Sequence, residues 1–124
     1  MVAATRTRRR KTLADGSVPE RVIQAQILDW LKDSGVLHWR ANSGIAFTGH
    51  RRIFLGPDGM PDIVLLAPPN GKFVGLEVKS KNGSVRKDQV AFAKKISDVG
   101  GMYFIVRSLT DAKAATAQAL GALS

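Results

Sequence analysis

Two short apolar segments joined by a Pro-Pro-Asn-Gly turn constrain the fold of this chain more than any other feature. The segments Ile63 to Leu66 and Phe73 to Lys79 are rich in β-branched and aromatic residues and have the length of strands. The turn between them, at residues 68–71, predicts that they pair as an antiparallel hairpin. A sheet therefore begins in the middle of the chain.

The turn also predicts which residues of the hairpin face each other. If Ala67 faces Lys72, then Asp62 faces Glu77, because the numbers of paired residues keep a constant sum. Directly opposed residues have Cβ atoms roughly 4.5 to 5.5 Å apart on the same face of the sheet. This register places two carboxylates side by side, where their like charges repel each other.

Alternation along the second strand adds Lys79 to the face that carries Asp62 and Glu77. The intervening residues point the other way, into the core: Val74, Leu76 and Val78. A bound divalent cation with oxygen ligands would relieve the repulsion and the desolvation of the charges. Alternatively, both strand ends lie at the sheet edge, where Lys79 neutralises Glu77 and water solvates Asp62. The residues alone leave both interpretations open.

The other elements follow from hydrophobic periodicity and from glycines that end helices. They are a helix over residues 17–34, a strand over 36–42, a loop or irregular hairpin over 43–59 lying over something acidic, a helix over 84–99 capped by Ser84, a strand over 102–106 that is fully apolar, and an Ala-rich helix over 109–123. The order α-β-β-β-α-β-α predicts an α/β fold with a mixed central sheet flanked by helices.

The charge of the chain favours a polyanionic partner. Lys and Arg number 19 against 10 Asp and Glu, and five basic residues crowd the first eleven positions. We expect residues 1–16 to form a mobile basic arm and residues 17–124 to form one domain. Nucleic acid is the partner that this balance favours, and a merely solubilising surface is the alternative.

The chain has no cysteine, which excludes disulfides, thiolate zinc sites and a cysteine nucleophile. It also shows no signal peptide and no apolar run long enough to cross a membrane. We therefore expect a soluble, intracellular, cytoplasmic protein.

Two further polar residues fall on otherwise apolar helix faces. Glu20 shares the face of Ile23 and Ile27, and Gln89 lies on the apolar face of the helix over 84–99. Each has a structural alternative. Ser17 and Glu20 fit a capping box, and Gln89 could satisfy a neighbouring backbone group.

Several short motifs follow one another along the chain in an order that is informative about its family. They are Gly59-Met60-Pro61-Asp62, then Leu76-Glu77-Val78-Lys79, then a helix entering with Gln89, and a strand ending in Val106-Arg107-Ser108. This set resembles the VRR-NUC family of virus-type replication and repair nucleases, within the PD-(D/E)xK superfamily, over about residues 18 to 110. The resemblance implies a restriction-endonuclease-like fold and metal-dependent hydrolysis of phosphodiesters.

The same resemblance implies the metal site. Asp62 and Glu77 would hold Mg²⁺ or Mn²⁺ together with the backbone carbonyl of Val78, and Glu20 occupies the matching helical acid position.

The rest of the catalytic set follows from the resemblance as well. Lys79 would position the attacking water and stabilise charge, and Gln89 would orient the water, Lys79 or the scissile phosphate. Six basic residues near the site in sequence could follow the phosphates of DNA: Arg40, Arg51, Arg52, Lys81, Arg86 and Lys87.

The implied activity is that of a DNA endonuclease of the stand-alone phage or prophage type, acting as a homodimer on branched DNA such as Holliday junctions. A competing hypothesis is a non-catalytic, basic nucleic-acid-binding module that serves as a subunit of a DNA-processing complex. The complete set of Asp62, Glu77 and Lys79 argues against that hypothesis.

Overall fold

The computed structural model describes residues 12–41 and 45–121 of the chain. The five basic residues of the predicted arm all lie before residue 12, outside the described residues, so a mobile arm stays a prediction. Within the described ranges, no helix is long and apolar enough to cross a bilayer.

Four strands form the central sheet, in the order β1-β4-β5-β6. They are β1 (His38–Arg40), β4 (Ile63–Ala67), β5 (Lys72–Val78) and β6 (Met102–Val106). Strand β4 runs antiparallel to both β1 and β5, whereas β6 pairs with β5 in parallel. The sheet is therefore mixed, as predicted, because a helix between β5 and β6 returns the chain to the same end of the sheet.

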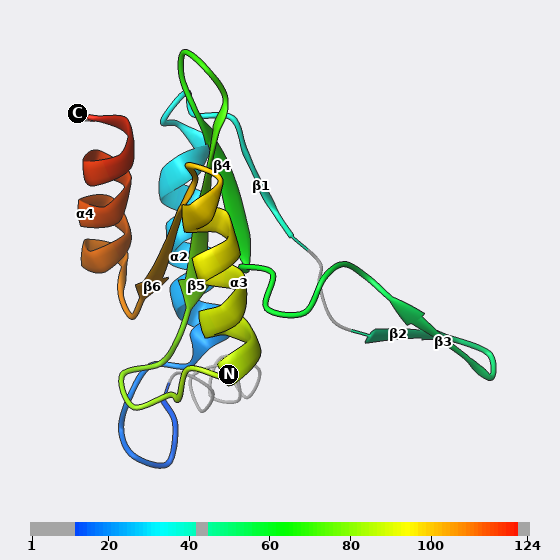
Figure 1. Ribbon diagram of the computed structural model, residues 1–124. Helices are drawn as coiled ribbons and strands as arrows, with labels where there is room; N and C mark the ends of the chain where they lie inside the picture. The colour runs from blue at the N-terminus through cyan, green and yellow to red at the C-terminus, as the bar shows by residue number, and fades with distance from the viewer. Residues whose placement is uncertain (1–11, 42–44, 122–124) are drawn as a thin grey trace.

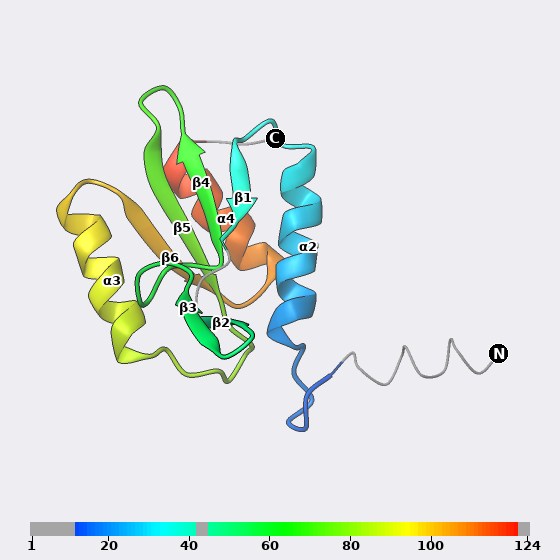
Figure 2. The same ribbon diagram turned by 90° about the vertical axis from the view of Figure 1, so that its right-hand side faces the viewer.

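Three helices cover the two faces of this sheet. Helices α2 (Glu20–Lys32) and α4 (Leu109–Leu120) lie on one face, and α3 (Lys87–Asp98) lies on the other, as Figures 1 and 2 show from two directions. This arrangement confirms the α/β fold with flanking helices.

The main core lies between the sheet and the pair α2 and α4. Val74, Leu76 and Val78 of β5 are fully buried there, as the alternation of the sequence predicts. They belong to one apolar cluster with residues of both helices, among them Ile27, Leu31 and Ala112. Because α2 and α4 cover this face, the other residues of β5 point toward α3.

The register of the central hairpin is the predicted one. Ala67 pairs with Lys72, and Ile63 pairs with Leu76. Asp62 directly precedes Ile63, so the same register brings it opposite Glu77, on the face of the sheet that α3 covers.

The helix starts differ from those predicted. Helix α2 begins at Glu20 with Pro19 at its N-cap, and the amide of Ser17 donates instead to Asp15 Oδ1 at 2.9 Å. The capping box of Ser17 and Glu20 is therefore wrong. Proline is favoured at a helix start because its missing N–H would be unsatisfied there.

The other boundaries also move. Helix α3 begins at Lys87 after an N-cap at Arg86, so the predicted cap at Ser84 is wrong. Four elements also end one to three residues earlier than predicted. Their observed last residues are Lys32 in α2, Arg40 in β1, Asp98 in α3 and Leu120 in α4.

Residues 45–54 form a regular hairpin where a loop or irregular hairpin was predicted. Strands β2 (Ile45–Thr48) and β3 (Arg51–Phe54) pair antiparallel in a separate two-stranded sheet, which adds two strands to the predicted order. The hairpin projects away from the central sheet (Figure 1), and the expectation that it lies over something acidic stays a prediction. Phe47 and Ile53 of this hairpin do not join the core, since they are 69% and 41% exposed.

Candidate active site

The turn before β4 sets the position of Asp62. Gly59 in this turn has a φ of +85°, and a Cβ at that position would lie 2.2 Å from the carbonyl oxygen of Asp88 on α3. On the β6 side, the hydroxyl of Tyr103 donates a hydrogen bond of 2.9 Å to the Gly59 carbonyl. The turn is thus docked between α3 and β6 so closely that only glycine fits.

The next residues lock Asp62 onto the sheet. Pro61 is buried against Gly75 of β5, where a Cβ would lie only 2.6 Å from the Pro61 ring. The carbonyl of Asp62 accepts a hydrogen bond from the Ala41 amide, and its Oδ2 accepts one from the Val78 amide, both at 2.8 Å. These contacts explain the glycine and the proline of the Gly-Met-Pro-Asp motif, because both residues serve the placement of the aspartate.

Glu77 lies on β5 beside this aspartate and is almost inaccessible to water. Its side chain is surrounded by polar partners: Gln89 Nε2 donates to Glu77 Oε2 at 2.8 Å, and Lys79 Nζ lies 3.6 Å from the same oxygen. Glu77 and Lys79 are each only 4% exposed. The structure therefore brings together Asp62, Glu77, Lys79 and Gln89, the four residues predicted to be catalytic.

Burial disfavours the charged forms of both acids, and the charge of Asp62 further disfavours that of Glu77. Burial, followed by the charge of Asp62, raises the pKa of Glu77 to about 7, although Lys79 acts in the opposite direction. Burial also raises the pKa of Asp62, against the hydrogen bond from the Val78 amide. The hypothesis of a solvated sheet edge is wrong for this pair, because Glu77 lies on a strand with hydrogen-bonded neighbours on both sides.

Gln89 has two partners, the Arg86 amide and Glu77. The first confirms the structural alternative, that Gln89 satisfies a neighbouring backbone group, whereas its orientation of water, Lys79 or the phosphate stays a prediction. Its Oε1 accepts from the Arg86 amide at 2.9 Å, which caps α3, while its Nε2 holds Glu77. The side chain is 1% exposed. One amide group therefore ties the start of a helix to the acidic pair.

Glu20 lies at the start of α2, on the other side of the loop that follows β5. Its Oε2 would be 3.3 Å from a Cβ on Gly83, and its charge adds to the effect of burial in raising the pKa of Asp62. Within the described ranges, no three His, Asp or Glu side chains gather closely enough to form a metal-binding group.

The donors at the centre of the site are two carboxylates, and Val78 lies next to them, because its amide bonds Asp62 Oδ2 at 2.8 Å. Oxygen donors suit hard cations, and Mg²⁺ in particular is usually held by one or two carboxylates while it keeps several waters. A carboxyl pair with raised pKa values also gains from a nearby cation. Asp62 and Glu77 therefore fit a divalent metal ion.

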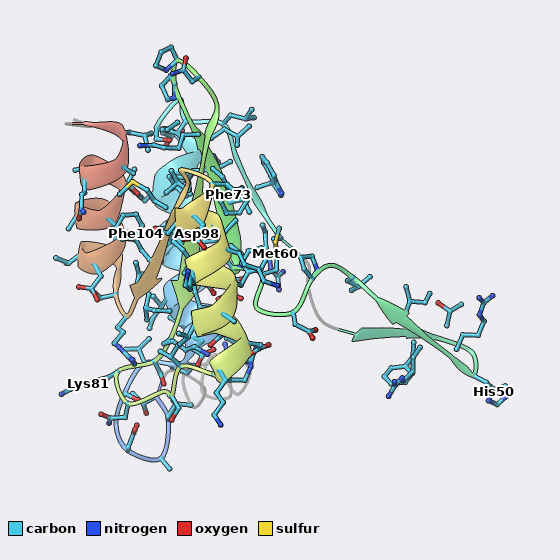
Figure 3. The ribbon with its side chains drawn as sticks, viewed as in Figure 1. His50, Met60, Phe73, Lys81, Asp98 and Phe104 are labelled. Atoms are coloured by element: carbon cyan, nitrogen blue, oxygen red, sulfur yellow. The ribbon has the colours of Figure 1, made fainter. Side chains whose placement is uncertain are left out.

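The six basic residues proposed for DNA lie at different distances from this site. Lys81, Arg86 and Lys87 belong to the loop and helix start directly after β5, and Figure 3 shows Lys81 pointing outward at that end of the domain. Arg40 ends β1, the strand next to β4. Arg51 and Arg52 lie on the projecting hairpin, whose tip carries His50 (Figure 3).

Two residues that support the site were missed. Tyr103 lies on a strand predicted to be fully apolar, and its hydroxyl was the signal that it needs a polar partner. Arg107 was noted only as part of a motif, although an arginine directly after an apolar strand marks a charge close to the core.

The fold and the site together define a class of protein: a small α/β domain in which an aspartate before one strand meets a Glu-x-Lys sequence at the end of the next. Comparison with known proteins identifies the family within this class. The VRR-NUC domain model matches residues 18–109, and the chain belongs to this family of nucleases.

A solved structure described as a VRR_NUC domain has the same fold. It superposes with a TM-score of 0.52 at 23% sequence identity, over 73% of this chain and 86% of the other. No curated protein matches the chain.

Proposed function

We propose that this protein is a metal-dependent DNA endonuclease that hydrolyses phosphodiester bonds. The observation that carries the proposal is the buried pair of Asp62 and Glu77, with raised pKa values, at which Lys79 and Gln89 converge. A pair of this kind is unfavourable for stability, and its placement by a dedicated turn and helix cap favours a functional reason for it. Membership of a nuclease family supports the same conclusion.

Asp62, Glu77 and the Val78 carbonyl are the residues that would hold Mg²⁺ or Mn²⁺. Glu20 faces the loop after β5 and would complete the acidic side of the site. When bound, the ion lowers the pKa of a water molecule and neutralises charge on the phosphate.

The remaining two residues act on either side of Glu77. The ammonium group of Lys79 has three N–H donors and lies beside Glu77. In the proposed reaction it positions water and stabilises charge on the phosphate. The amide of Gln89 already bonds Glu77 Oε2, so we assign it the orientation of this carboxylate. Orientation by a buried neighbour is typical of the residues that support metal ligands.

We propose branched DNA, such as a Holliday junction, as the substrate, and a homodimer as the active form. The resemblance to stand-alone phage-type nucleases supports both, since a dimer has two sites for two strands. Positive side chains at the end of the domain that carries the site, Lys81, Arg86 and Lys87, suit the phosphate backbone.

The test compares wild type with Asp62→Asn and Glu77→Gln on labelled four-way junction, flap and linear duplex. We expect cleavage in Mg²⁺ or Mn²⁺, none with chelator, and a loss of at least about 100-fold in both variants. Faster cleavage of the junction than of the duplex would support the proposed substrate.

Asp98→Asn is the matched control, because Asp98 is an exposed acid on α3 that pairs with Lys94 at 2.9 Å. Its cleavage rate should equal that of wild type. If wild type and all variants bind the junction alike and none cuts it, the protein is a non-catalytic DNA-binding module and the proposal fails.

A further inference from the structure

The loop that leads from β5 to α3 is held by one side chain from another strand. This loop, residues 80–86, follows Lys79 directly and ends at the cap that Gln89 makes. It has no regular secondary structure, yet Ser80 is only 6% exposed. Contacts other than the backbone hydrogen bonds of a strand or a helix must therefore fix the path of this loop.

Arg107 supplies that constraint. Its Nη1 donates hydrogen bonds to three backbone carbonyls of the loop, those of Ser80 at 2.7 Å, Gly83 at 2.9 Å and Lys81 at 3.2 Å. Three acceptors from four consecutive residues converge on one cationic nitrogen. Such convergence fixes the curvature of the loop, because the carbonyls repel each other unless a donor lies between them.

Arg107 is itself held at both sides. The parallel pairing of β5 with β6 places it just beyond the bond from the Lys79 amide to the Val106 carbonyl, which is 3.0 Å long. Its own amide donates to Asp111 Oδ2 at 2.9 Å, in the first turn of α4. The backbone of Arg107 is therefore fixed next to Lys79, and its side chain extends from there to the loop.

The far side of the loop meets the N-terminal segment. Gly83 lies close to Glu20, whose Oε2 would be 3.3 Å from a Cβ there, and Asn82 Nδ2 donates to Asp15 Oδ2 at 3.0 Å. The path of the loop thus sets how Glu20 stands relative to the pair of Asp62 and Glu77. Any change in the path of the loop would move Glu20 and Lys79 relative to the pair of Asp62 and Glu77.

We propose that Arg107 is a positioning residue for the nuclease reaction, which fixes the loop after β5 so that Lys79 and Glu20 are held in register with Asp62 and Glu77. This proposal rests on the proposed nuclease function. Arg107 does not contact DNA phosphates in this role, because its Nη1 serves the carbonyls of the loop.

The test uses Arg107→Ala and Arg107→Lys in the full chain with a labelled four-way junction. Junction binding is measured with Ca²⁺ in place of Mg²⁺, and the single-turnover cleavage rate is measured at saturating protein with Mg²⁺. We expect the rate of Arg107→Ala to fall by about 100-fold, the size of effect that small misplacements produce, with binding within about twofold of wild type.

Chemical rescue separates positioning from a general loss of structure. Guanidinium at roughly 20 mM, far below denaturing concentrations, should restore part of the rate of Arg107→Ala. The same concentration of methylammonium or sodium should not, since neither has a planar fork of donors. Arg107→Lys should stay folded, as thermal unfolding will show, and should cut more slowly than wild type.

Three results would overturn the inference. The first is cleavage by both variants within about twofold of wild type. The second is a slower reaction explained by weaker binding, with the slope of log K against log salt reduced by about one, which identifies a phosphate contact. The third is a slow but folded Arg107→Lys together with no guanidinium rescue of Arg107→Ala. Absence of cleavage by wild type itself would instead overturn the proposed function.

Discussion

The side-chain amide of Gln89 donates a 2.8 Å hydrogen bond to the carboxylate of Glu77, across 12 residues of sequence and between α3 and β5. Its oxygen accepts from the Arg86 amide at 2.9 Å. The cap of the helix and the orientation of the acid are therefore properties of one group.

Replacing this group should affect both stability and activity. Gln89→Ala leaves the Glu77 carboxylate without its donor and the Arg86 amide without its cap, so we expect the free energy of unfolding to fall by about 1 to 3 kcal/mol. The single-turnover cleavage rate should fall at least about 10-fold. Val90→Ala, at the exposed neighbouring position, is the control and should change neither. A wild-type rate in Gln89→Ala would contradict the assigned role.

The stability of the metal-free protein should depend on pH because of Glu77. Its pKa is about 7 in the folded protein, above the value of 4.5 for the free side chain, so the folded state binds more protons between these values. The stability that the protonated form contributes is complete below about pH 4.5 and is lost as the pH rises through about 7.

We therefore expect Tm in chelator to fall from about pH 5 to about pH 8, and Glu77→Gln to remove most of that fall. Asp15 does not interfere, because hydrogen bonds from Ser17 and Asn82 lower its pKa from 3.8 to about 2, and its contribution is lost only as the pH falls from 3.8 through about 2. Thermal unfolding across this range measures both proteins. A wild-type Tm that rises over the same range would contradict the prediction.

Gly75 should matter for metal binding as well as for packing. A methyl group there would lie 2.6 Å from the Pro61 ring, so Gly75→Ala should displace the turn that carries Asp62 and destabilise the fold by about 1 to 3 kcal/mol. Calorimetric titration with Mn²⁺ should show weaker binding. Gly101→Ala is the matched control, because its Cβ would lie 2.7 Å from Ile96 Cγ2 near the C-terminal end of α3. Equal Mn²⁺ affinity in the two variants would refute this account.

The projecting hairpin should contribute to DNA binding more than to the chemical step. Arg51→Ala should weaken junction binding and reduce the slope of log K against log salt by about one, while the rate at saturating protein stays within about twofold. Lys94→Ala on α3 removes an equal charge from a side chain that pairs with Asp98 and serves as the control. If both variants bind alike, the hairpin arginine is not a phosphate contact.

The sequence predicted the central hairpin well, because turn length and alternation together leave one register that buries Val74, Leu76 and Val78. The same register was enough to bring Asp62 and Glu77 together. Helix starts were predicted less well, since Ser17 and Ser84 fit the cap pattern but the N-caps are Pro19 and Arg86, each two residues later.

Other parts of the site carry no local signal. The acceptors of Arg107 are backbone carbonyls 24 to 27 residues earlier, and that of Tyr103 is 44 residues away. Every residue has a backbone carbonyl, so the sequence does not show which carbonyl will accept a distant hydrogen bond. These contacts can therefore be identified only from the folded structure. The direction of the β2–β3 hairpin was equally hidden, because Phe47 and Arg52 pair with each other and not with the core.

The position of Glu77 within the sheet has a consequence for how the protein loses activity. Strand β5 has a hydrogen-bonded neighbour on each side, β4 and β6, and both of its faces are covered by helices. Separating Glu77 from its surroundings requires the sheet itself to open, so its amide should exchange with solvent only as fast as the whole domain unfolds. Heat inactivation should then coincide with global melting, with no intermediate that is folded but has a frayed reaction centre.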